Sequence, residues 1–190
     1  VLWIGGGSPF SDDDFNPGGL FKYDQKRDEI SPYLHSPEET SLISDIVSAI
    51  FEDSRGVFWV GTAGDGLHTM DREKGTFVRY RYDPKNPNKL SRPALRNIID
   101  YTVDFITFIN EDNQGQIWIG TYEGGLNRYD PNSKYITYFG IEQVGSLSWW
   151  DFFKTKDGLL WISSWGIDGQ KDRLLKINTA PGILNYTEMG

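Results

Sequence analysis

Short runs of apolar and aromatic residues alternate with polar, glycine-containing turns along the whole chain. Four of these runs share a tryptophan set among large apolar residues, at residues 1–5, 57–62, 117–121 and 160–163. In the second run, apolar residues stand at consecutive positions from Val57 to Val60. An uninterrupted apolar run of this length predicts a strand that is covered on both faces.

The residues around each tryptophan run predict three more strands per unit. Turns rich in Asp, Asn and Gly precede the tryptophan run at 52–56, 111–115 and 156–158. Glycine turns follow it at 18–20, 65–67 and 124–126, and each opens a strand. Aromatic-containing fourth strands are expected at 30–33, 77–80 and 136–139. Asp and Gly favour tight reversals, so each unit is predicted to be a meander of four strands, A to D, with the tryptophan on strand B.

The spacing of this unit predicts an all-β fold made of β-propeller blades. The tryptophans recur about 40 to 60 residues apart, which is in or just above the range of four-stranded blades. We expect a single partial propeller of about four blades, with a first blade that enters at strand B. The expected segments are blade one at 1–42, blade two at 43–82, a connection at 83–103, blade three at 104–140 and blade four at 141–190.

Composition supports this fold and narrows the function. Aromatic residues make up 15% of the chain and glycine occurs 21 times, which suits many short strands and tight turns. The net charge of -8 argues against a nucleic-acid partner. The chain has no cysteine, which excludes thiolate metal sites and disulfides. No apolar run is long enough for a membrane helix, so we expect no membrane contact by this segment, and any targeting sequence to lie outside it.

The repeated residues resemble the two-component regulator propeller repeat, in which Glu-Asp and Gly precede a Trp strand and Gly-Gly-Leu and Tyr-Asp follow. Blade two matches nearly throughout, from Glu52 to Asp71. Blade four departs from the pattern, with Ser163 and Ser164 in place of Gly-Thr. The resemblance implies a periplasmic sensory segment of sensor kinases or hybrid two-component proteins, many of which respond to oligosaccharides. We expect no cofactor and no catalytic activity of this segment, because the sequence offers no credible base, nucleophile or metal set.

Two sets of repeated residues are interpreted as structural. A tryptophan at the same strand position in every blade is expected to fill the space between blades. An aspartate beside glycine in each A–B turn is expected to cap backbone amides rather than to bind a metal. These structural residues are Trp3, Trp59, Trp118, Trp161, Asp53, Asp112 and Asp157.

Residues that break the repeat are the better candidates for ligand binding. The A–B turns are short and alike, whereas the B–C and D–A connections differ between blades, and in a meander these connections share one face. Aromatic and acidic groups on that face suit a saccharide, and they are Asp65, Tyr122, Glu123, Trp149, Trp150 and Trp165. The pair Trp149 and Trp150 has a second interpretation, as the start of strand A in blade four.

Two other functional classes stay open at this point. A propeller lyase similar to the streptogramin lyases would need a catalytic base, and His35 and His68 have no motif partner. A protein-interaction scaffold would use the same fold. The acidic run 12–14 lacks the spacing of a calcium loop and is interpreted as a solvated loop.

The blade count predicts further partners. Closed propellers usually have about four to eight blades. Three full units and one partial unit would leave apolar terminal faces. We therefore expect them to be covered by remaining propeller blades or by a second copy of the chain. The other expected partner is a small molecule, an oligosaccharide on the resemblance.

Overall fold

The predicted fold class is confirmed: the computed structural model is nearly all β. It describes residues 1–8, 18–64, 66–80, 105–122, 124–146, 148–166, 171–179 and 185–189, the last range by its backbone. Four antiparallel sheets contain three, four, four and four strands. One helix of a single turn, α1 (Ile141–Val144), joins the third sheet to the fourth within the described chain.

Each sheet is formed by consecutive strands, as the meander predicts. Blade one contains β1 (Leu2–Gly6), β2 (Gly19–Asp24) and β3 (Glu29–Tyr33). Blade two contains β4 (Val47–Glu52), β5 (Phe58–Thr62), β6 (Leu67–Asp71) and β7 (Thr76–Tyr80). Blade three contains β8 (Ile106–Glu111), β9 (Ile117–Thr121), β10 (Leu126–Asp130) and β11 (Tyr135–Phe139). Blade four contains β12 (Trp149–Lys154), β13 (Leu159–Ser164), β14 (Arg173–Asn178) and β15 (Asn185–Met189).

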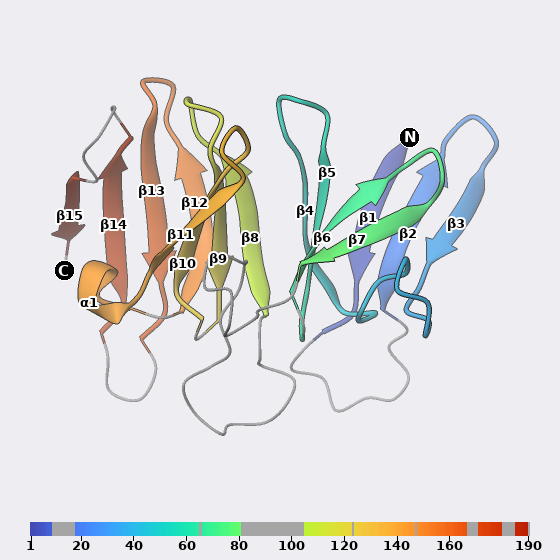
Figure 1. Ribbon diagram of the computed structural model, residues 1–190, viewed down its shortest axis with the longest axis horizontal. Coiled ribbons are helices and arrows are strands. Elements are labelled where there is room, and N and C mark those ends of the chain that lie inside the picture. The colour runs from blue at the N-terminus through green and yellow to red at the C-terminus, as the bar shows by residue number, and fades with distance from the viewer. Residues whose placement is uncertain are drawn as a thin grey trace.

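The four sheets stand side by side in chain order (Figure 1). The first strands of the full blades are neighbours, because β4 contacts β8 and β8 contacts β12. The A–B hairpins β4–β5, β8–β9 and β12–β13 project at the upper edge of the view, and strands B end at the lower edge (Figure 1). The described residues that follow strands B and precede strands A therefore lie on the face opposite the A–B hairpins (Figure 1).

One apolar cluster lies between each pair of neighbouring blades. Between blades one and two, Leu20 packs with Val60 and Phe77. Between blades two and three, the cluster is built around Trp59. Between blades three and four, it is built around Trp118. These two tryptophans are almost completely buried, so each is a packing residue between blades.

The A–B turn holds the tryptophan of the next strand by a hydrogen bond. In blade two, the Asp53 carboxylate accepts from the Trp59 indole Nε1 at 3.0 Å. It also accepts from the backbone N–H groups of Arg55 and Val57, at 2.9 Å each. In blade three, Asp112 accepts from Trp118 Nε1 at 2.8 Å. The same buried carboxylate thus satisfies the turn amides and the indole.

Blade four corrects the sequence alignment of this turn. The backbone turn is the same, because Thr155 N donates to Leu159 O as Asp53 N donates to Val57 O. Thr155, and not Asp157, therefore takes the position of the capping aspartate. Asp157 is exposed and accepts a hydrogen bond from the Thr155 hydroxyl. Asp157 was assigned to the capping position because it stands beside Gly158. The capping position is defined instead by its separation along the sequence from the tryptophan.

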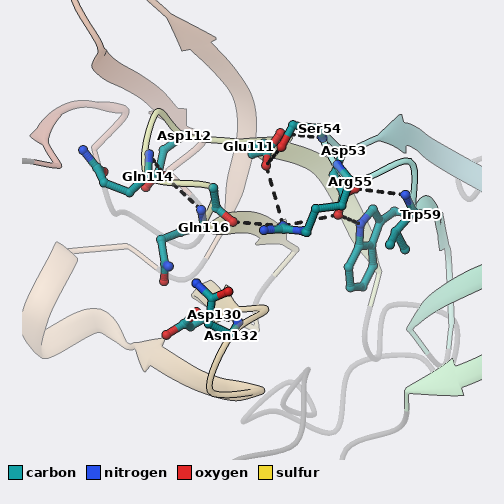
Figure 2. Close-up of polar contacts among 12 residues, drawn as sticks. Asp53, Ser54, Arg55, Trp59, Glu111, Asp112, Gln114, Gln116, Asp130 and Asn132 are labelled. Carbon is teal, nitrogen blue, oxygen red and sulfur yellow. Dashed lines mark hydrogen bonds and ion pairs between the residues drawn. The ribbon is translucent and has the colours of Figure 1, made fainter.

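A polar network joins the turns of blades two and three (Figure 2). The Glu111 carboxylate accepts from the Ser54 backbone N–H at 2.8 Å and from the Ser54 hydroxyl at 2.7 Å. Arg55 lies 3.3 Å from Asp53 and 3.6 Å from Glu111, and it donates to the Gly115 carbonyl at 3.0 Å. The carboxylates of Asp53 and Glu111 are therefore engaged within the protein.

The terminal blades present apolar residues that have no covering sheet among the described residues. On blade one, Leu2, Ile4 and Ile30 are 48%, 46% and 66% exposed. Trp161, on blade four, is half-buried, and its neighbour across the sheet, Phe153, is exposed. Trp161 is therefore more exposed than Trp59 and Trp118, each of which is covered by the blade that follows it.

Candidate functional site

Each full blade has a β-bulge near the start of strand A, and the bulge changes the direction of one side chain. The register shifts between Val47 and Ala49, between Ile106 and Phe108, and between Trp149 and Asp151. The bulged residue is Ser48 in blade two, Thr107 in blade three and Trp150 in blade four. Bulges redirect side chains and are frequent at functional sites.

The bulged residues of blades two and three link neighbouring blades. The Ser48 hydroxyl donates to the Ile106 carbonyl at 2.5 Å. The Thr107 hydroxyl donates in the same way to the Trp149 carbonyl. In blade four, an indole replaces the linking hydroxyl. Trp150 is therefore a departure from the repeat at a position that packing alone fills with a small polar residue.

The Trp150 ring lies at the centre of an aromatic cluster. Its centroid is 5.7 Å from that of Tyr122, 6.0 Å from that of Phe105 and 5.5 Å from that of Trp165. Phe105 and Tyr122 are 6.2 Å apart. These four residues, from blades three and four, form the aromatic cluster. Phe105 is buried, Tyr122 and Trp150 are half-buried, and Trp165 is 56% exposed.

The backbone fixes the outer members of the cluster. Tyr122 N donates to the Phe105 carbonyl at 2.9 Å, and Trp165 N donates to the Ser148 carbonyl at 3.2 Å. The equivalent bond in blade two runs from Ala63 N to the Ile46 carbonyl. The residue that follows strand B is thus alanine in blade two, tyrosine in blade three and tryptophan in blade four. The same backbone position carries a larger side chain in each successive blade.

Polar groups border the exposed end of the cluster. The Gly166 N–H, next to Trp165, donates to the Asp172 carboxylate at 2.9 Å. Asp172 is exposed. The border thus combines an aromatic face with a carboxylate whose remaining lone pairs face solvent. Sugars are recognised by this combination of a flat apolar surface and hydrogen-bonding groups.

The structure brings together three of the six candidate residues. The Trp150 ring is in contact with the rings of both Tyr122 and Trp165. Trp149 is not part of this surface: it is completely buried, and its indole Nε1 donates to the Ser146 carbonyl at 3.2 Å. The two side chains diverge as consecutive residues of a strand do, and Trp150 is the bulged one of the pair. The candidates Asp65 and Glu123, the acidic run 12–14 and the connection 83–103 lie outside the described residues.

Sequence reasoning missed Phe105. It precedes β8 by one residue, and no repeated motif marks that position. Its equivalents are Ile46 and Ser148, which accept the backbone bonds described above. No sequence signal marks Phe105, because the bulge that aligns these positions is visible only in the strand register.

No catalytic or metal-binding constellation is found among the described residues. No group of three His, Asp or Glu side chains there could hold a metal ion. His68 is completely buried, its Nε2 accepting from Ile43 N at 3.2 Å and its Nδ1 lying 3.3 Å from the Val60 carbonyl. The His35 Nδ1 lies 2.9 Å from the Leu42 carbonyl. Both histidine rings are thus bonded to the main chain. The described part of the chain also has no helix that is long and apolar enough to cross a membrane.

Two segments match a family model, which is described as two component regulator propeller. The matched residues are 41–64 and 100–123. Their described parts contain the A–B hairpins β4–β5 and β8–β9. No curated protein matches the chain significantly.

Three solved structures share the fold. The extracellular domain of a putative one component system from B. thetaiotaomicron is 21% identical, with a TM-score of 0.63 over 92% of this chain and 22% of that one. The extracellular domain of a putative hybrid two component system from the same organism is 21% identical, with a TM-score of 0.57 over 90% of this chain and 26% of that one.

The third structure is PorZ, a surface component of the type-IX secretion system of Porphyromonas gingivalis. It is 19% identical, with a TM-score of 0.56 over 95% of this chain and 22% of PorZ. The chain thus spans about a quarter, or less, of the length of these proteins. At this identity the similarity establishes the fold.

Proposed function

We propose that this chain, which carries two-component regulator propeller repeats, is a ligand-sensing segment that binds an oligosaccharide at the aromatic cluster without changing it chemically. The observation that carries the proposal is the replacement of a linking hydroxyl by Trp150, together with the exposed ring of Trp165 beside it. Packing between blades requires neither ring, because blade two makes the same turns with Ser48 and Ala63.

The chemistry of the cluster supports a sugar ligand. The exposed Trp165 ring can stack against the C–H face of a pyranose, with the half-buried Tyr122 and Trp150 rings behind it. Asp172 can accept hydrogen bonds from sugar hydroxyls at the border. The position on the B–C and D–A face also supports binding, because variable connections on a fixed scaffold usually carry recognition.

We also propose that the segment catalyses no reaction of its ligand. A lyase needs a base placed beside its substrate, whereas both ring nitrogens of His68 and the Nδ1 of His35 are bonded to backbone groups of blades one and two. We further propose that the segment acts outside the cytoplasm, as in the extracellular domains whose fold it shares. Its ligand would signal by binding two arrangements of the whole sensor with different affinity.

Calorimetry with a panel of oligosaccharides tests the proposal. We expect at least one to bind and to be recovered unchanged. Trp165→Ala should weaken that binding roughly tenfold or more, because it removes the exposed stacking surface. The control is Phe153→Ala, which removes an equally exposed ring outside the cluster and should leave the affinity unchanged.

Two results would count against the proposal. Equal affinity of the wild-type and Trp165→Ala proteins would exclude the aromatic cluster as the site. Appearance of a reaction product in the calorimeter cell would identify the chain as an enzyme and favour the lyase alternative.

A further inference from the structure

A cavity of about 380 Å³ lies between blades three and four. It shares no residue with the aromatic cluster. The described residues that line it come from β9, β10, β11, α1 and β14, and they are Trp118, Leu126, Phe139, Glu142, Gln143, Val144, Leu175 and Ile177. Its volume is within the range of small-molecule sites, about 300 to 1,000 Å³.

Comparison of the blades gives the physical origin of this cavity. In blade three, Tyr129 packs its ring on Trp59 of the preceding blade, at 5.6 Å and an angle of 66°. The strand register places Ile177 at the same position in blade four, since Arg128 pairs with Trp118 as Lys176 pairs with Trp161. An isoleucine has no ring to lay on Trp118. The residue at the position that packs on the preceding tryptophan is therefore smaller in blade four than in blade three.

The Trp118 ring also packs with a ring of its own blade, as Trp59 does with Tyr80. Trp118 and Phe139 are nearly parallel, at 15° with their centroids 5.8 Å apart. Both line the cavity, and the aliphatic side chains of Val144, Leu175 and Ile177 line it as well. A lining of two aromatic and several aliphatic side chains favours an aromatic ligand, which gains contact area without leaving polar groups unpaired.

One charged side chain is present among the described lining residues. Glu142, on α1, is exposed and has no hydrogen bond or ion pair with the described residues. The neighbouring Gln143 is engaged in the turn, where its side-chain oxygen accepts from Gly140 N at 2.9 Å. Glu142 is thus available to a ligand, and a carboxylate favours a partner that donates hydrogen bonds or carries a positive charge.

We propose that this inter-blade cavity binds a small aromatic compound whose ring lies against Trp118 and Phe139 and whose amine or hydroxyl reaches Glu142. The site is separate from the oligosaccharide site proposed above. It would serve as an effector site between blades three and four, where a bound ring takes the place that Tyr129 has one blade earlier. A ligand there would stabilise the packing of these two blades.

Three small probes test the chemistry: phenethylamine, 2-phenylethanol and 3-phenylpropionate, added to the full chain and followed by the NMR resonance of the Trp118 indole. We expect phenethylamine to shift this resonance at the lowest concentration, and phenylpropionate to bind about three-fold or more weakly because Glu142 repels it. Glu142→Gln should remove most of this preference and leave the binding of 2-phenylethanol unchanged.

Cavity-filling variants test the location. Ile177→Tyr copies the residue of blade three and should abolish binding of all three probes while the melting temperature stays equal or rises. Val144→Phe fills the cavity from α1. It provides a second test if the tyrosine of the first variant is too large for the space. Trp165→Ala is the control and should leave probe binding unchanged, so that this site and the oligosaccharide site are tested separately.

The proposal is overturned if none of the probes shifts the Trp118 resonance, or if both filling variants bind them as the wild type does. A fall in melting temperature for both filling variants would also overturn it, because it would show that the space is already occupied.

Discussion

Trp59 and Trp118 combine burial between two blades with one hydrogen bond from the preceding turn. Each indole Nε1 donates to a buried aspartate that also accepts two backbone N–H groups. Removal of one of these tryptophans would therefore leave a cavity and an unsatisfied carboxylate oxygen together. Tyr122 has neither property, because it is half-buried at the edge of the aromatic cluster.

We expect Trp118→Ala to lower the free energy of unfolding by about 3 to 5 kcal/mol. Tyr122→Ala should cost much less, since most of the cost of truncation comes from full burial. Denaturant titrations of both variants measure the difference. Similar losses of stability for the two variants would mean that the assignment of Trp118 to the core and of Tyr122 to the rim is wrong.

Single residues also show where sequence reasoning succeeds and where it stops. Trp59 and Trp118 could be assigned to the core because the same turn and strand recur around both. The division of Trp149 and Trp150 between core and surface could not be predicted, because it depends on a bulge that changes the alternation of side chains. Thr155 was missed because it shares a position with Asp53 but not its chemistry.

At the scale of elements, the turn between strands C and D is repeated in three blades. Asp24, Asp71 and Asp130 each accept a hydrogen bond from the backbone N–H two residues later, at 2.9, 3.1 and 2.9 Å. These bonds help to hold the pKa of all three carboxyls below its usual value. The main cause is the Lys26 N–H for Asp24, the Lys74 ammonium for Asp71 and the Asn132 N–H for Asp130.

The lowered pKa values predict how these turns respond to acid. A carboxyl whose pKa is lower in the folded state stabilises the fold above its ordinary pKa of about 4. That contribution is lost as the pH falls through the folded pKa. Replacement of all three aspartates by asparagine keeps an acceptor in each turn. We therefore expect the triple variant to lose less stability than the wild type between pH 6 and pH 3, as measured by urea unfolding.

An equal loss for the two proteins would show that the C–D turns do not contribute to acid sensitivity. The single variant Asp172→Asn is a suitable control, because that carboxylate lies outside the C–D turns.

At the scale of the whole molecule, the terminal faces differ from their internal equivalents. Leu2 and Ile4 flank Trp3 as Phe58 and Val60 flank Trp59. Phe58 and Val60 are 4% and 0% exposed, because blade one covers them, whereas the pair in blade one is about half exposed. The described face of blade one thus carries the same kind of apolar residues as a face that a neighbouring blade covers. We propose that remaining blades or a second copy of the chain cover it.

The 190-residue chain is therefore expected to self-associate. Sedimentation velocity should show dimers or larger species at micromolar concentration, and the double variant Ile4→Glu with Ile30→Glu should shift the distribution toward monomer. Val78→Glu is the matched control, since Val78 is exposed on β7 of blade two and not on a terminal face. A wild-type chain that sediments as a single monomeric species would contradict this expectation.

The central claim is that an oligosaccharide binds at the aromatic cluster without being converted. The most direct measurement follows the indole N–H resonances of the tryptophans while an oligosaccharide that binds in calorimetry is added. The account predicts that the Trp150 and Trp165 resonances shift together, that those of the buried Trp59 and Trp118 stay in place, and that the sugar spectrum is unchanged afterwards. Unmoved Trp150 and Trp165 resonances at saturating ligand, or new sugar signals, would contradict it.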